Sequence, residues 1–149
     1  MIVATAQTTD VSLTLPAEPG AAALARRELV QAGLGEDIEH TVALLATELV
    51  TNAVRHAGLR SGDRMALRAT IEPDFARVEL HDGGGGFDPE VRHETSGFGL
   101  RLMETLSSQW GTTGPPGFAV WFEVDRRTGQ RFARDKQRPA TSRSSQLRP

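Results

Sequence analysis

The sequence predicts an α+β domain, a two-layer sandwich in which helices cover one face of a mixed, mostly antiparallel sheet. Two observations favour this class. Apolar residues recur at helical spacing through residues 21–32 and 38–54, whereas residues 64–71, 76–80 and 118–124 alternate apolar and polar as strands do. The 149 residues fit one domain of ordinary size, which we place at residues 10–125 after a flexible N-terminus of residues 1–9.

The first half of the chain predicts one strand and two helices. Residues 11–15 alternate as a short strand, and residues 21–32 are rich in helix-forming Ala, Leu, Arg and Glu until Gly33 and Gly35 end them. Asp37 is suited to cap the second helix. Apolar residues cover a wider part of this second helix than in a helix at the surface, which predicts that the helix is buried in the core.

The second half predicts two hairpins and one more helix. Residues 64–71 and 76–80 flank a turn at Glu72-Pro73-Asp74, and residues 109–113 pair with 118–124 across a Gly-Pro-Pro-Gly turn. Between the hairpins lie a run of four glycines at residues 83–86, a short loop, and a helix beginning near Leu100.

Composition narrows the class of protein. The formal net charge of −2 gives no indication of direct DNA binding, and the absence of cysteine excludes disulfides and thiolate metal sites. The four histidines lack zinc-ligand spacing, and no apolar run reaches the length of a membrane span. We therefore expect a cytoplasmic protein without membrane association. Residues 126–149 hold eight Lys or Arg against one acid, which predicts a basic disordered tail.

Glu48 and Asn52 lie one helical turn apart in the stretch ELVTNAVRHA, at the border of the apolar arc. Alone, such a pair is more simply a helix edge that faces solvent. Asp82 ends a predicted strand before the four glycines, and Gly97-Phe98-Gly99 precedes a helix. Taken alone, these are ordinary turn signals.

Together, these three pieces supply the parts of a Mg-nucleotide site. Asn52 offers Mg²⁺ a hard oxygen, and Glu48 can accept a proton. Asp82 can accept a hydrogen bond from the adenine amino group, and the backbone N–H groups from Gly97 to Leu100 can hold phosphates. The chain has no P-loop, protein-kinase or dinucleotide-binding motif.

The three motifs resemble the N box, G1 box and G2 box of the GHKL ATPase superfamily, which has a Bergerat-type ATP-binding fold. ELVTNAVRHA resembles the N box, DGGGG from Asp82 the G1 box, and GFGL from Gly97 the G2 box. The short chain and the closing strand are most similar to the anti-sigma factor serine/threonine kinases. The resemblance covers roughly residues 10–125.

The resemblance implies roles for individual residues. Asn52 would ligate Mg²⁺, Glu48 would be the catalytic base, and Asp82 would contact adenine. The base pocket would be lined by Gly84 and Gly86, and the phosphates would lie against Gly97, Gly99 and Leu100. An arginine of the first helix would approach the γ-phosphate, and Arg26 fits that place, with Arg27 as its rival.

We therefore expect an ATP- and Mg²⁺-dependent serine/threonine kinase that phosphorylates an anti-sigma factor antagonist, sequesters a sigma factor and forms a homodimer. The segment matching the ATP lid, residues 87–96, is short. This keeps open a second interpretation, a non-catalytic module that binds nucleotide or a protein partner. A histidine-kinase fragment is a third, disfavoured because too few residues precede Ile38 for a phosphoacceptor hairpin.

Overall fold

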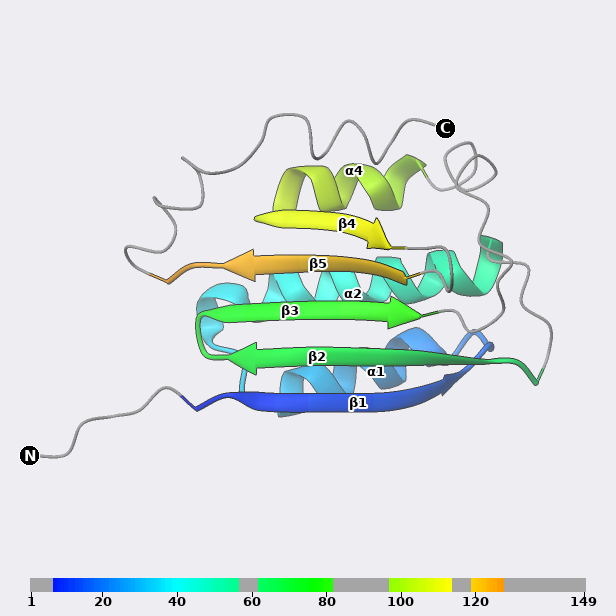
Figure 1. The fold of residues 1–149 in the computed structure, drawn as a ribbon, viewed down its shortest axis with the longest axis horizontal. Coiled ribbons are helices and arrows are strands. Elements are labelled where there is room, and N and C mark those ends of the chain that lie inside the picture. Colours follow the sequence, from blue (N-terminus) through cyan, green and yellow to red (C-terminus); the bar gives the residue numbers. More distant parts are fainter. Residues whose placement is uncertain (1–6, 57–61, 82–96, 114–118, 128–149) are drawn as a thin grey trace, which may run out of the picture.

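The computed structural model describes residues 7–56, 62–81, 97–113 and 119–127. Five strands and three helices occupy these residues (Figure 1). The helices are α1 (Ala21–Gln31), α2 (Glu36–His56) and α4 (Gly97–Leu106). The strands are β1 (Thr9–Pro16), β2 (Arg64–Glu72), β3 (Phe75–His81), β4 (Gln109–Thr113) and β5 (Ala119–Asp125).

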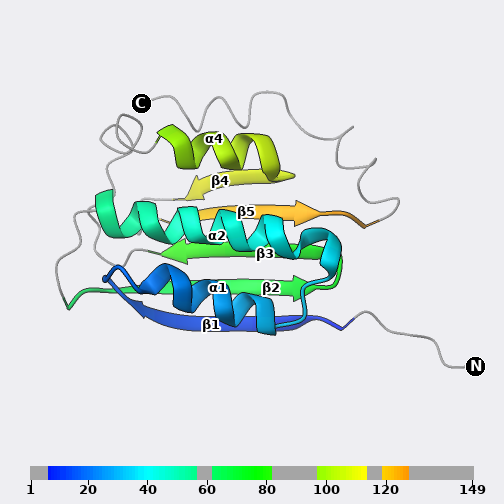
Figure 2. The same cartoon turned by 180° about the vertical axis from the view of Figure 1, so that it is seen from behind.

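The strands form one sheet in the order β1-β2-β3-β5-β4, and the helices cover one face of it (Figure 2). This confirms the α+β class and the two-layer arrangement. Every strand pair that the structure describes is antiparallel, so these strands supply no parallel component of the mixed sheet that we expected. Both predicted hairpins, β2–β3 and β4–β5, are present.

The core lies between the sheet and α2. Side chains at every fourth or third position of α2 are buried, from Ile38 through Leu45 to Ala53, against alternate residues of β2, β3 and β5. This is the wide apolar arc expected from the sequence. Burying such side chains stabilises each by about 1.5–3 kcal/mol relative to exposure, so the packing of α2, together with that of α1, holds the two layers together.

The connection from α1 to α2 depends on two glycines. Gly33 has a φ of +109°, a left-handed conformation that ends α1 at little cost only for residues without a Cβ. Gly35 then precedes α2, and its carbonyl oxygen accepts hydrogen bonds from the N–H groups of Ile38 and Glu39. Asp37, which we expected to cap α2, lies inside its first turn, where its negative charge still suits the helix dipole.

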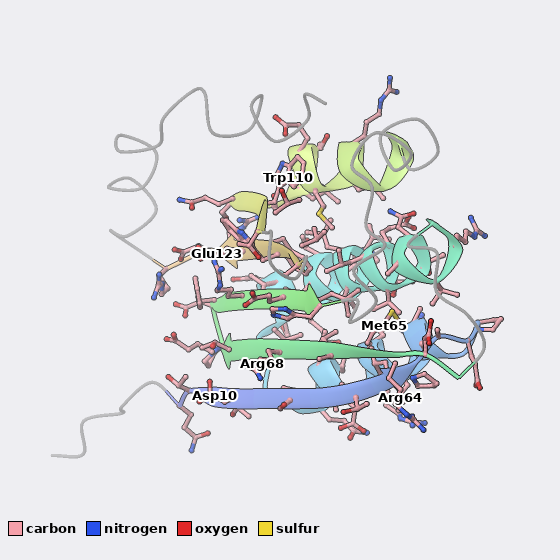
Figure 3. All side chains as sticks on the ribbon, turned by 45° about the vertical axis from the view of Figure 1, so that its right-hand side comes forward. Asp10, Arg64, Met65, Arg68, Trp110 and Glu123 are labelled. Carbon is pink, nitrogen blue, oxygen red and sulfur yellow. The ribbon has the colours of Figure 1, made fainter. Side chains whose placement is uncertain are left out.

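The face of the sheet that no helix covers is polar, and its side chains interact with one another. Figure 3 labels Asp10, Arg68 and Glu123, which lie on this face. Arg77 donates to Glu123 at 3.0 Å, and its guanidinium carbon lies 4.2 Å from the centroid of the Trp121 ring. An antiparallel sheet can leave such a face in water.

The end of β5 is fixed to the β2–β3 turn. Arg127 donates to both carboxylate oxygens of Asp125, and its guanidinium also lies over the ring of Phe75. Asp125 is only 2% exposed, and its hydrogen bond with Arg127 raises the pKa of that arginine. The backbone N–H of Arg126 donates to the carbonyl oxygen of Asp74. Two residues at the start of the predicted tail are thus ordered, while residues 128–149 lie outside the described residues.

Candidate functional site

Glu48 and Asn52 lie on α2 where the sequence places them, at the border of its buried face. Both are half-buried, while Leu49 and Ala53, which follow them, are 1% exposed. Within the part of the chain that the structure describes, neither side chain has a hydrogen-bond or ion-pair partner. The buried neighbours therefore hold a carboxylate and an amide at a fixed edge of the helix layer, one turn apart.

The ends of three secondary-structure elements lie at the same end of the molecule. The C-terminal end of α2, the C-terminal end of β3 and the N-terminal end of α4 all lie on the right in Figure 1 and on the left in Figure 2. The helices α2 and α4 are also in contact. The C-terminal half of α2, which carries Glu48 and Asn52, therefore runs toward the end of the sandwich at which the residues matching the G2 box begin α4, as a single nucleotide site requires.

The residues matching the G2 box open α4. The helix begins at Gly97, so Gly97, Gly99 and Leu100 lie in its first turn, whereas we expected the helix to begin near Leu100. The first four N–H groups of a helix have no intrahelical partner, and glycine, which has no side chain, lets a ligand approach them closely. Those N–H groups and the helix dipole attract anions, which suits phosphate oxygens.

The other predicted contacts with the nucleotide lie outside the described residues. They are Asp82, which would meet the adenine amino group, and the glycines Gly84 and Gly86. The segment that matches the ATP lid, residues 87–96, also lies outside them. The strand leading to these residues is described as far as His81, next to the buried Leu80.

Arg26 and Arg27 both lie exposed on α1, which runs beside α2. The buried side of α1 is formed by Ala21, Ala22, Ala25 and Leu29. At about 100° per residue, Arg27 points almost directly away from that side, whereas Arg26 lies beside its edge. Arg26 therefore lies nearer the packed side of α1 than Arg27, although among the described residues neither has a hydrogen bond or ion pair with Glu48 or Asn52.

The donor chemistry near Asn52 suits magnesium bound together with a nucleotide. Among the described residues, no group of three or more His, Cys, Asp or Glu side chains is placed to enclose a metal ion. Mg²⁺ bound to nucleotides takes one or two protein oxygens and completes its shell with phosphate oxygens and water. A single amide oxygen from Asn52 fits that mode of binding.

A shallow pocket of about 340 Å³ lies on the opposite face of the sheet, which the sequence did not single out. It is formed over β1, β2 and β3 by alternate polar residues that include Ser12, Arg68, Thr70 and Arg77. The strand alternation could have predicted that these residues share a face. They lie on the side of the sheet away from α2, so the pocket is separate from the candidate nucleotide site.

The fold and the site define an α+β domain of the ATP-binding class, with an acid-and-amide helix edge beside a helix N-terminus. The family model of the histidine kinase-like ATPase domain matches residues 15–123, and the chain belongs to that family. Its membership supports ATP binding and the GHKL superfamily. No curated protein matches the chain significantly. No helix among the described residues is long and apolar enough to span a membrane.

Proposed function

We propose that this protein is an ATP-dependent serine/threonine kinase of the anti-sigma factor type. It would bind Mg-ATP, transfer the γ-phosphate to a Ser or Thr of an anti-sigma factor antagonist, and sequester a sigma factor. The observation that carries the proposal is that the C-terminal end of α2, the helix that holds Glu48 and Asn52, lies at the same end of the fold as the N-terminus of α4. Membership of the histidine kinase-like ATPase family supports the nucleotide part.

Each proposed role follows from the chemistry of one group. Asn52 would hold Mg²⁺ through its amide oxygen, and the first-turn N–H groups of α4 would bind the phosphate chain. Asp82 would accept a hydrogen bond from the adenine amino group, with Gly84 and Gly86 lining the base pocket. Mg²⁺, when bound, would neutralise charge on the β- and γ-phosphates.

The transfer itself would depend on Glu48 and an arginine. A hydroxyl oxygen of the antagonist would form a bond to the γ-phosphorus as the bond to the oxygen shared with ADP breaks. Glu48 would take the hydroxyl proton, and Arg26 would stabilise the negative charge on the transferring phosphoryl group. Most of the rate enhancement would come from positioning and electrostatics.

Calorimetry with Mg-ATP on Asn52→Ala tests the binding part. We expect its affinity to fall at least about tenfold, because the metal loses its protein ligand. Arg55→Ala is the matched control, since Arg55 is exposed on the same helix. Unchanged binding by Asn52→Ala would remove the Mg²⁺ assignment.

The protein partners need a separate experiment. The native chain is used to recover partners with and without ATP, and phosphoserine or phosphothreonine on them is sought by mass spectrometry. A phosphorylated partner supports the kinase. Nucleotide binding with no phosphorylated partner, and no γ-phosphate transfer to added antagonist candidates, would favour the non-catalytic module instead. We further propose, from the resemblance, that the protein acts as a homodimer.

A further inference from the structure

The pocket on the uncovered face of the sheet is formed by the register of three strands. Two rows of cross-strand neighbours on β1, β2 and β3 surround it, namely Ser12–Arg68–Glu79 and Asp10–Thr70–Arg77. The short hydroxyl side chains of Ser12 and Thr70 stand among four longer charged ones, which leaves a volume of about 340 Å³ between them. Sites for small molecules usually have roughly 300–1,000 Å³, so a small molecule fits this pocket.

Three of the four charged side chains around the pocket already have partners on the same face of the sheet. These pairs are Arg77 with Glu123 at 3.0 Å, Glu79 with Nε2 of His81 at 3.0 Å, and Asp10 with the hydroxyl of Thr70 at 3.3 Å. Their bonding capacity is therefore partly used within the protein, and their positions around the pocket are restrained.

Arg68 is the fourth charged side chain, and it has no hydrogen bond or ion pair with any residue that the structure describes. It is exposed on β2, beside the strand that carries Asp10, and both residues are labelled in Figure 3. Its guanidinium presents five N–H donors in a planar fork. The hydroxyl of Ser12, directly opposite on β1, likewise has no hydrogen bond to a described residue. The pocket thus contains one unpaired positive charge next to an unused hydroxyl.

We infer that this pocket binds a small molecule through a single carboxylate group, held by Arg68 and Ser12. A guanidinium pairs with a carboxylate through two parallel N–H···O bonds, and the hydroxyl supplies a further donor. One negative charge balances the one unpaired positive charge. A phosphate group carries about −1.5 to −2 charges at pH 7, and it fits less well because the carboxylates of Asp10 and Glu79 also line the pocket.

The carboxylate site is separate from the proposed nucleotide site. On β2, the side chains that alternate with Arg68, such as Leu67, are buried in the core that packs against α2. The sheet therefore lies between the pocket and the helix that carries Glu48 and Asn52. The inference goes beyond the proposed kinase and depends on none of its residues.

Titration of the full chain with benzoate tests the site. Benzoate, benzamide and phenylphosphonate share one ring and differ in the group attached to it, so they compare a carboxylate with a neutral amide and a phosphonate. Each is added at constant ionic strength while amide NMR spectra are recorded. We expect benzoate to shift the signals of Ser12, Arg68 and Thr70 in a saturable way, with a Kd below about 10 mM. The other two probes should bind at least about tenfold more weakly.

Arg68→Gln and Arg64→Gln form a matched pair of variants. Both arginines are exposed on the same face of β2, but Arg64 does not line the pocket. We expect the affinity for benzoate to fall at least about tenfold in Arg68→Gln and to stay within about twofold in Arg64→Gln. Arg68→Lys should give an intermediate affinity, because lysine keeps the charge but loses the planar fork.

Ser12→Leu tests the same pocket without a change of charge. The larger side chain would occupy the space between the charged residues, so we expect the affinity for benzoate to fall at least about tenfold. The amide spectrum of each variant shows whether the sheet is intact.

Three results would overturn the inference. They are a Kd for benzoate on the native chain above about 10 mM, an equal loss of affinity in Arg64→Gln and Arg68→Gln, and phenylphosphonate binding as tight as that of benzoate. The Mg-ATP affinity of Arg68→Gln should equal that of the native chain. This measurement distinguishes a failure at the carboxylate site from a failure of the proposed kinase.

Discussion

Gly35 lies against Pro73 so closely that no side chain fits between them. The N–H of Gly35 donates to the carbonyl oxygen of Pro73 at 2.8 Å, and a Cβ added to Gly35 would stand 2.2 Å from that oxygen. The contact joins the start of α2 to the turn between β2 and β3. It fixes where the helix that carries Glu48 and Asn52 begins relative to the sheet.

Gly35→Ala should destabilise the protein, because the new methyl group forces backbone away from backbone. We expect a loss of about 1–3 kcal/mol in the free energy of unfolding, measured by urea denaturation. Gly20→Ala is the matched control, since a Cβ there has no neighbour within 4 Å and the glycine has an ordinary φ of −76°. Equal stability of the two variants would contradict this account.

Arg127→Ala should destabilise the end of β5, because it leaves the buried carboxylate of Asp125 without its bidentate partner. We expect a loss of about 2–4 kcal/mol, because a buried carboxylate that loses the guanidinium of its ion pair is costly. Asp125→Asn in the Arg127→Ala background should recover part of it, since an amide carries no charge. Thermal unfolding of the native, single and double variants forms the test, and strictly additive losses would rule out the coupling.

Trp110→Phe should loosen the contact between α4 and β4. The indole Nε1 of Trp110 donates to Oε2 of Glu104 at 2.9 Å, and Phe keeps an aromatic ring but loses the donor and the volume of the second ring at a buried site. We expect about 1–3 kcal/mol less stability by chemical denaturation, from the lost hydrogen bond and the space left behind. Thr105→Ala, an exposed neighbour on α4, is the control. A Phe variant as stable as the native chain would show that the hydrogen bond contributes nothing.

Glu48→Ala should separate binding from chemistry. If Glu48 takes the proton of the substrate hydroxyl, its removal leaves Mg-ATP affinity within about twofold and lowers the rate of phosphoryl transfer by about 10²–10⁴. Transfer of labelled γ-phosphate to the recovered partner gives the rate, and calorimetry gives the affinity. Glu39→Ala, at the other end of α2, is the control. Transfer at the native rate would exclude Glu48 as the base.

The parts of the fold that depend on local pattern were predictable. The alternation in β2 and β3 predicted their hairpin, and helical spacing predicted the buried face of α2 with Glu48 and Asn52 at its border. The start of α2 was not predictable from Asp37, because Gly35 is fixed by a distant residue, Pro73.

The burial of two carboxylates on β5 could not be predicted from the local sequence pattern either. Alternation predicted that Val120, Phe122 and Val124 face the core, and they do. The same alternation puts Glu123 and Asp125 on the opposite face, where acids are ordinarily exposed. Both are buried there because Arg77 and Arg127 pair with them, and only the folded chain shows those partners. Which of Arg26 and Arg27 would approach the γ-phosphate could not be predicted from the sequence for the same reason, since it depends on how α1 packs.

The backbone hydrogen bond from Arg126 to Asp74 has a consequence for the design of fusion proteins. It holds the chain, as it leaves β5, at the end of the sheet away from the start of α4 (Figure 1). A fluorescent protein or affinity tag joined after Arg127 would therefore begin far from the proposed nucleotide site. Titrations with such a fusion should match those of the untagged chain.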